Sequence, residues 1–241
     1  MQRYFAKSKN NNQLILNDND LYHINTVMRM KPNDKMEIVF NHQLFLCSLN
    51  NSKDGANIIE ELEHINTKMP QVTLIIPLLK EQKMDLILQK ATELGVSKFI
   101  PVIMERSIVK IDDKKVIKKL ERWQSICKEA SEQSKRIDIP VIENIKTIND
   151  LKNLEGLNII CSTSKNINNL KYCLKNNMGY DKINIVIGPE GGIAPKEEEK
   201  LISFGFNPIS LGNRIMRVET VPMVILSIIN YEYMEWFYVY W

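Results

Sequence analysis

The sequence predicts an α/β protein in which a small, mainly β module precedes a larger domain built on a parallel sheet. After Pro70, apolar strand-like runs alternate with amphipathic helical segments, which is typical of parallel-sheet domains. Before Pro70 the apolar segments are short and are separated by turn-forming residues. We therefore expect two domains, 1–70 and 71–241.

The first module contains several short strand candidates and one helical candidate. Clusters of Asn, Asp, Gly and Pro separate the predicted strands, which are 13–16, 35–40, 43–49 and 57–64. Asn41 and His42 stand between two apolar runs and favour a hairpin turn. Apolar residues recur at helical spacing in 20–29. This pattern predicts a small barrel with one helix.

The second domain begins with 72–79, an almost continuous apolar run that is typical of a strand buried on both faces. Residues 84–94 then have apolar positions at helical spacing, and Gly95 stands where such a helix ends. The remaining predicted strands are 98–104, 157–162, 182–187 and 208–211, and the remaining predicted helices are 114–135, 167–176, 195–204 and a last one from Glu219.

Composition narrows the classes of function. The chain has 241 residues, of which 44% are hydrophobic and 25% charged, as in an ordinary globular protein. A net charge of +3 does not by itself indicate nucleic acid, although it permits a local basic face. The four cysteines and three histidines lack metal-ligand spacing, so we expect no metal, no disulfide and a reducing cytoplasm. We also expect no secretion signal and no membrane partner, because the run 221–229 is too short to cross a bilayer.

The segment IVIGPEGGIAPKEEE, at 185–199, is the first candidate binding element. A strand, a glycine-rich turn and a helix in succession present backbone N–H groups to a ligand. The segment lacks the Lys-Ser or Lys-Thr of a phosphate-binding loop, which disfavours a nucleotide hydrolase, and it comes too late in the domain for a dinucleotide fingerprint. Because Glu190 and the three glutamates at 197–199 would repel phosphate, a neutral or cationic ligand is favoured. A purely structural turn is the alternative.

A second segment, LGNRIMRVET at 211–220, repeats the arrangement of a short strand, a glycine-containing turn and a helix. Turns that follow parallel strands meet at one edge of the sheet, where α/β proteins bind ligands. Arg214 and Arg217 add positive charge to this turn. We therefore expect the two turns to lie side by side.

Together these motifs resemble the family that methylates N3 of uridine in small-subunit ribosomal RNA, within the SPOUT superfamily. Five further segments resemble the family in the expected order: MQRYF at the start, HINTVMRMKPND (23–34), QKATELGVSKFIPV (89–102), ERS (105–107) and EASEQSKRIDIP (129–140). The resemblance implies a PUA-like β-barrel at 1–70 that binds RNA. It also implies a SPOUT domain at 71–241 with a C-terminal trefoil knot that binds S-adenosylmethionine, and a homodimer. The implied partner is ribosomal RNA, either naked or in an assembled small subunit.

The resemblance also implies the site residues. Cofactor contacts are expected at Ile187, Gly188, Gly191, Leu211, Gly212, Ile215, Met216 and Arg217. As N3 of the uridine loses its proton, negative charge spreads over the flanking carbonyls, so a well-placed arginine stabilises the transition state. Arg136 is expected to take this role, with Arg217 as the second choice. Glu132 and Glu190 are candidates for the general base, and bulk solvent is the alternative. Without the resemblance, Glu132 and Arg136 would read as a surface ion pair.

Positively charged residues of the first module are expected to contact RNA phosphates. Arg3, Arg29 and Lys31 lead this group, and Arg106 of the second domain joins it. The alternative is a set of solvated surface side chains. The aromatic tail at 231–241 is expected in the dimer interface, with base stacking as the alternative.

Two other functions remain open from the sequence. One is a SPOUT methyltransferase that acts on another RNA position. The other is a catalytically silent RNA-binding factor of ribosome assembly, which the two intact glycine turns disfavour.

Overall fold

The computed structural model describes residues 1–64, 69–109, 113–165, 167–177 and 179–233. The chain forms two compact units: one comprises Met1–Asn66 with Lys128–Ile139, and the other comprises Thr67–Cys127 with Pro140–Trp241. The C-terminal end of the long helix α3 (Asp113–Gln133) therefore belongs to the N-terminal unit. The division expected at residue 70 would instead leave all of this helix in the second domain.

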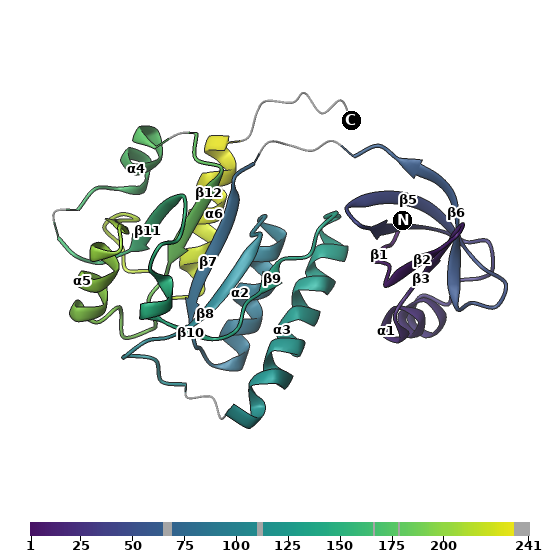
Figure 1. Cartoon of the computed structure of the whole chain (residues 1–241), viewed down its shortest axis with the longest axis horizontal. Helices are drawn as coiled ribbons and strands as arrows, with labels where there is room; N and C mark the ends of the chain where they lie inside the picture. Colours follow the sequence, from purple (N-terminus) through teal and green to yellow (C-terminus); the bar gives the residue numbers. More distant parts are fainter. Residues whose placement is uncertain (65–68, 110–112, 166, 178, 234–241) are drawn as a thin grey trace. The chain divides into compact units, whose positions relative to one another are not determined.

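The N-terminal unit is built on a six-stranded mixed sheet with the order β1-β4-β5-β6-β3-β2 (Figure 1). Its strands are β1 (Arg3–Phe5), β2 (Ser8–Asn10), β3 (Gln13–Ile15), β4 (Lys35–Phe40), β5 (Gln43–Leu49) and β6 (Gly55–Leu62). Strand β1 pairs in parallel with β4, and the other neighbours are antiparallel. The predicted strands at 35–40 and 43–49 are confirmed to the residue.

The turn between β4 and β5 shows why these strands form a hairpin. Asn41 and His42 have φ angles of 49° and 62°. A tight two-residue hairpin needs positive φ at both positions, and asparagine tolerates this region better than most residues. The predicted helical segment is also present, as helix α1 (Asp18–Tyr22) continued by the π-helical turn η1 (His23–Val27). The sequence pattern missed the short strands β1 and β2.

The C-terminal unit confirms the predicted parallel sheet. Its strand order is β10-β8-β7-β12-β11-β13, with β9 also paired to β8, and all of these pairs are parallel. The strands are β7 (Gln71–Pro77), β8 (Lys98–Ile103), β9 (Val141–Ile142), β10 (Lys146–Thr147), β11 (Leu157–Cys161), β12 (Lys182–Val186) and β13 (Asn207–Ile209). The other elements are α2 (Glu81–Glu93), the 3-10 turn η2 (Ile148–Leu151), α4 (Leu170–Asn176), α5 (Pro195–Ser203) and α6 (Thr220–Tyr233).

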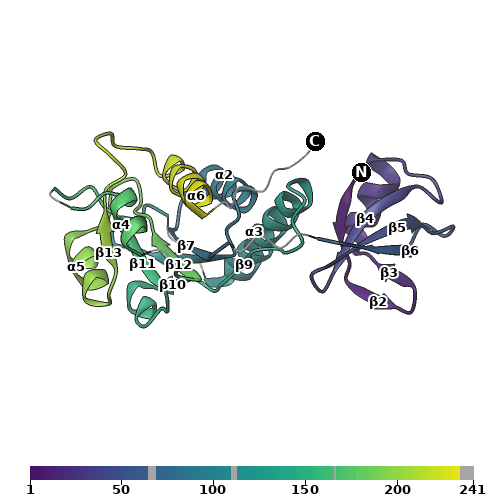
Figure 2. The same cartoon turned by 90° about the horizontal axis from the view of Figure 1, so that it is seen from above.

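Both faces of this sheet are covered. Ile75 of β7 packs in a cluster with Leu201 of α5 and Leu151 of η2. Successive residues of a strand point to opposite faces, and Leu74 and Ile76 are fully buried as well. Helices α2 and α6 pack against each other (Figure 2).

The predicted end of helix α2 at Gly95 is confirmed. Gly95 follows the helix with a φ of 93°, a left-handed conformation that glycine adopts without steric cost. The side-chain amide of Asn230 on α6 donates a hydrogen bond to the carbonyl oxygen of Leu94, 2.9 Å away. Helix α6 therefore supplies a partner for a carbonyl that the end of α2 leaves free.

Candidate functional site

Three loops meet at one edge of the parallel sheet in the C-terminal unit. They follow β11, β12 and β13, which are neighbours in the sheet and run in the same direction. Their carboxyl ends therefore lie at the same edge, the usual place for ligands in α/β folds. The two glycine-containing turns of the sequence are the loops after β12 and β13.

Two adjoining cavities lie among these loops. The first, which we call the glycine-loop cavity, has a volume of about 550 Å³ and is lined mainly by 188–193 and 215–219. The second, the β13-loop cavity, has a volume of about 640 Å³ and is lined mainly by 161–165 and 210–216. Both are lined by Ser162, Ile215 and Met216. Their sizes suit ligands of drug or cofactor dimensions.

The glycine loop has a backbone that side chains would disturb. A Cβ atom added at Gly188 would lie 2.8 Å from Cγ1 of Ile193 and 3.0 Å from its backbone nitrogen. Gly192 has a φ of 73°, and its N–H donates to the carbonyl oxygen of Pro189 at 2.8 Å, which closes a tight turn. Gly212, in the loop after β13, has a φ of 116°. At Gly192 and Gly212 the left-handed backbone favours glycine, whereas at Gly188 the close approach of Ile193 does.

The glycine-loop cavity carries an excess of negative charge. Its ionisable lining comprises Glu190, Glu198 and Glu219 against Lys83 and Arg217. Burial disfavours the ionised form of Glu190, but a backbone hydrogen bond and the nearby Lys83 outweigh it and lower the pKa of this carboxyl. Glu190 is therefore a carboxylate at neutral pH. A cationic ligand would complement this lining.

Most of the expected cofactor residues lie at these cavities. Gly188, Gly191, Met216 and Arg217 line the glycine-loop cavity, whereas Leu211 and Gly212 line the β13-loop cavity. Ile215 lines both, and it is 89% exposed, which is unusual for an isoleucine.

Ile187 is the expected cofactor residue that does not line either cavity. Its side chain is buried, and its backbone N–H donates to the carbonyl oxygen of Ile75 at 3.1 Å. Ile187 therefore extends the pairing of β12 with β7 and supports the cavity from within the core.

Sequence reasoning missed the loop after β11. The hydroxyl of Ser162 donates to Oε1 of Glu198 at 2.7 Å, and the hydroxyl of Ser164 donates to the same oxygen at 3.1 Å. Ser162 also accepts a hydrogen bond from the backbone of Ser164 at 3.0 Å. The signal was a Ser-Thr-Ser run directly after a buried strand, the same placement that identified the two glycine turns.

Arg106, expected at RNA, has a different contact in the structure. Its Nη1 atom donates to the carbonyl oxygen of Gly191 at 2.9 Å. A Cβ atom at Gly191 would lie 3.3 Å from Cβ of Arg106. Arg106 thus packs against the glycine loop and binds its backbone.

The other two catalytic candidates, Glu132 and Arg136, belong to the N-terminal unit. Arg136 forms an ion pair with Asp138 at 2.6 Å. Glu132 accepts a hydrogen bond from Lys128 at 2.7 Å, and Lys128 also binds Asp20. Burial, partly opposed by Lys128, raises the pKa of Glu132 to about 7. A carboxyl with such a pKa exchanges protons near neutral pH.

The expected RNA contacts of the N-terminal unit differ in exposure. Arg3 is only 7% exposed, and its Nε and Nη2 atoms both lie 2.9 Å from Oε2 of Glu37. Arg3 therefore has its charge paired inside the unit, which corrects the expectation of an exposed phosphate contact. Arg29 and Lys31 are exposed and flank the buried Met30.

The described residues contain neither a candidate metal cluster nor a candidate membrane-spanning helix. Among them, no three His, Cys, Asp or Glu side chains are grouped so as to hold a metal ion. No helix in the described ranges has the length and apolar character needed to cross a membrane.

Similarity to known proteins identifies the class of protein to which the chain belongs. Residues 66–230 match the family model described as an RNA methyltransferase domain. The chain is also 32% identical over 249 residues to ribosomal RNA small subunit methyltransferase E of Bacillus subtilis (strain 168), which covers 96% of this chain and 97% of the relative. It is 33% identical to the protein of the same name from Mesomycoplasma hyopneumoniae (strain 232), over 94% of this chain and 98% of the relative.

Two solved structures extend the comparison. Ribosomal RNA small subunit methyltransferase E from Neisseria gonorrhoeae, bound to S-adenosyl methionine, is 30% identical and has a TM-score of 0.87, over 97% of this chain and 98% of that one. A methyltransferase from Legionella pneumophila in complex with the cofactor SAM is 26% identical and has a TM-score of 0.88. The match covers 96% of this chain and 98% of that one. The chain belongs to the family of ribosomal RNA small subunit methyltransferase E.

Proposed function

We propose that this protein transfers a methyl group from S-adenosylmethionine to N3 of a specific uridine in small-subunit ribosomal RNA. The observation that carries the proposal is the pair of adjoining cavities at the carboxyl edge of the sheet, in a chain of this family. Two relatives of similar structure are solved with this cofactor bound.

The residues at the cavities fit such a cofactor. The exposed Ile215 and the neighbouring Met216 offer apolar surface to an adenine ring. The turns that contain Gly188, Gly191, Leu211 and Gly212 line the cavities, and in this proposal their backbone groups contact the nucleoside. The carboxylates of the glycine-loop cavity match the positive charge of the sulfonium and ammonium groups. When bound, the cofactor supplies the electrophilic methyl group.

The chain's own residues orient the uridine and stabilise charge. As N3 loses its proton, Arg136 provides positive charge to the flanking carbonyl oxygens, and Arg217, at the cavity, is the second candidate for this role. Glu132 accepts the N3 proton, a task that suits a carboxyl with a pKa of about 7. Glu190 is the less favoured base because its pKa is lowered. Arg29 and Lys31 contact RNA phosphates.

Finer features of the fold are part of the same proposal. Helix α6 follows the edge strand β13 yet packs on α2, which follows the central strand β7. This return path supports a C-terminal trefoil knot of the SPOUT type. The mixed sheet of the N-terminal unit supports a PUA-like RNA-binding barrel. We also propose a homodimer that acts in the cytoplasm, where small ribosomal subunits reside; residues 234–241 of the aromatic tail assigned to its interface lie outside the described residues.

The test is direct. The protein is incubated with labelled S-adenosylmethionine and either unmodified small subunits or naked ribosomal RNA, and the product is located by mass spectrometry. A single 3-methyluridine supports the proposal, and the better substrate shows whether assembled subunit shape is read. Methylation at another position would mean that the protein is a methyltransferase with a different RNA target. Failure to bind the cofactor at all would favour a silent assembly factor.

A further inference from the structure

An ion triad joins three separate segments at the glycine-loop cavity. The Nζ atom of Lys83, in the first turn of α2, lies 3.0 Å from Oε1 of Glu190 in the glycine loop. The same atom lies 3.6 Å from Oε2 of Glu219, which directly precedes helix α6. All three residues line the cavity. One cation therefore pairs with two carboxylates, one from each of the two glycine-containing segments.

The two ion pairs of the triad differ in length, and the longer one leaves a carboxylate oxygen without a hydrogen bond. The distance from Lys83 to Glu219 is beyond hydrogen-bond length, and Oε2 of Glu219 is buried with no hydrogen-bond partner. A buried carboxylate oxygen without a donor is costly, so a donor from a ligand would stabilise it. Lys83 has three N–H donors and uses one on Glu190, so two remain for another acceptor.

An unsatisfied carboxylate beside a lysine with free donors is complementary to an amino acid zwitterion. We propose that Lys83 and Glu219 hold the amino-acid end of S-adenosylmethionine, with Lys83 binding the α-carboxylate and Glu219 binding the α-ammonium group. This inference rests on the proposed function and names the residues that recognise one end of its cofactor. It assigns the opposite end, the adenine, to the surface around Ile215 and leaves the sulfonium between the two.

Glu190 has a defined part in this arrangement. In the structure its carboxylate occupies one donor of Lys83 and holds the lysine over the cavity. Because Glu190 belongs to the glycine loop, the same contact joins the amino-acid subsite to a loop that lines the cavity. Arg217 lines the cavity too, but Lys83 is the cation that stands beside the unsatisfied oxygen of Glu219.

Three ligands separate this proposal from a structural role. S-adenosylmethionine and S-adenosylhomocysteine both carry the α-carboxylate and the α-ammonium, whereas methylthioadenosine keeps the nucleoside and sulfur but lacks the amino-acid end. Binding of each is measured by calorimetry to the wild type, Lys83→Ala and Glu219→Gln. Lys90→Ala is the matched control, because Lys90 lies on the same helix and pairs with Glu93 away from the cavity lining.

We expect Lys83→Ala and Glu219→Gln each to weaken both amino-acid-bearing ligands by about tenfold, the loss of one charge-assisted contact. Methylthioadenosine should bind all variants alike, and Lys90→Ala should match the wild type throughout. Equal losses for all three ligands would overturn the assignment, because the triad would then act by holding the loop. Unchanged binding of the first two ligands would also overturn it. A wild type that binds none of the three would instead refute the proposed function.

Discussion

The guanidinium of Arg106 is hydrogen-bonded through Nη1 to the carbonyl oxygen of Gly191 at 2.9 Å. The contact joins the segment after β8 to the loop after β12, and the side chain of Arg106 also packs where a Cβ of Gly191 would stand. The glycine loop is therefore held from outside by an arginine that the sequence alone assigned to RNA. We therefore expect removal of the Arg106 side chain to change ligand binding in the glycine-loop cavity.

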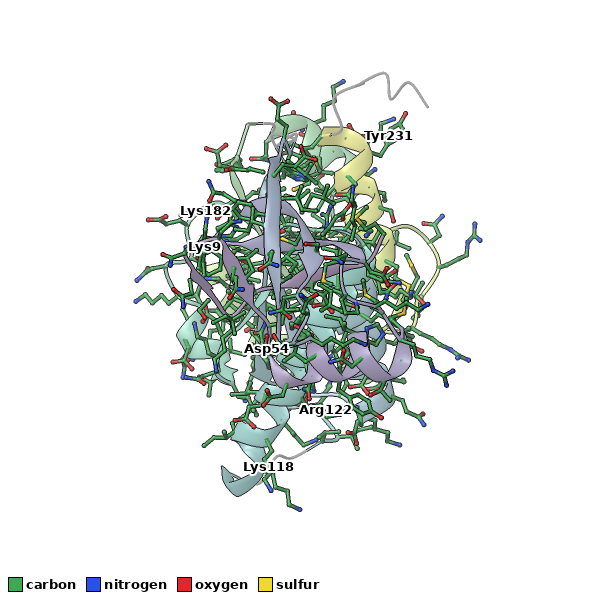
Figure 3. All side chains as sticks on the ribbon, turned by 90° about the vertical axis from the view of Figure 1, so that its right-hand side faces the viewer. Lys9, Asp54, Lys118, Arg122, Lys182 and Tyr231 are labelled. Carbon is green, nitrogen blue, oxygen red and sulfur yellow. The ribbon has the colours of Figure 1, made fainter. Side chains whose placement is uncertain are left out.

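We expect Arg106→Ala to weaken cofactor binding about fivefold when no RNA is present, because one hydrogen bond from a charged donor holds the loop. Calorimetry measures the effect. Arg122→Ala is the control, since Arg122 lies on α3 (Figure 3) and its guanidinium forms an ion pair with Asp85. If Arg106→Ala binds the cofactor normally and loses only RNA affinity, Arg106 is an RNA contact and the loop does not depend on it.

A second prediction concerns Gly188. Its Cβ in a Gly188→Ala variant would approach the backbone nitrogen of Ile193 to 3.0 Å, so the loop must shift. We expect cofactor affinity to fall at least about tenfold. Gly205→Ala is the control: Gly205 has a φ of 89°, lies at the end of α5 and has open space around its Cβ position. That variant should lose about 1 kcal/mol of stability and keep its affinity. Equal affinity in both variants would place the cofactor elsewhere.

A third prediction concerns RNA. The double variant Arg29→Ala with Lys31→Ala should bind ribosomal RNA less tightly, and its affinity should depend less steeply on salt. Loss of two phosphate contacts reduces the slope of log affinity against log salt by about 1.4 for single-stranded RNA. Filter binding at several salt concentrations measures this. Lys196 and Lys200, exposed on α5, provide a double control with the same loss of charge. An identical change of slope in both pairs would mean that only net charge matters.

A fourth prediction separates charge from structure at Arg136. Arg136→Ala should reduce the rate of methyl transfer by about a hundredfold or more while cofactor binding persists. This variant also breaks the ion pair with Asp138, so Asp138→Asn is the matched control. It removes the pair and keeps the arginine. Equal loss of turnover in both variants would give Arg136 a structural role, whereas unchanged turnover in Arg136→Ala would remove it from catalysis.

Local pattern predicted what depends on local structure. The strands at 35–40 and 43–49, the hairpin at Asn41 and His42 and the helix end at Gly95 follow from alternation, from turn residues and from glycine's access to positive φ. The polar strand β2 carries no such pattern, since its sequence is Ser-Lys-Asn and its place comes from pairing with β3. It was therefore missed.

Side-chain partners far apart in the sequence could not be predicted. Nothing near Arg3 indicates that Glu37 neutralises it, and nothing near Ser162 indicates Glu198. The edge of the sheet was predictable, because parallel strands must end together. The tertiary arrangement of separate loops decides which charged side chains lie together at that edge. A single sequence does not show this arrangement.

The last prediction concerns the buried carboxyl of Glu132. Its pKa is raised from 4.5 to about 7, with burial as the main cause, Lys128 opposing it and Asp20 adding to it. Tyr4 and His23 lie in the same cluster, hydrogen-bonded to each other at 3.0 Å. A carboxyl that binds its proton more tightly when folded contributes stability below pH 4.5, and this contribution is lost as the pH rises to about 7.

Thermal unfolding between pH 5 and pH 8 tests this. Because glutamine resembles the protonated carboxyl, Glu132→Gln should gain stability relative to the wild type as the pH rises, by about 1–3 kcal/mol at pH 8. Glu121→Gln, at an exposed position of the same helix, should show no such trend. A relative stability of Glu132→Gln that does not change with pH would mean that Glu132 stays ionised in the folded protein. It would then lose the property that suits it to accept the N3 proton.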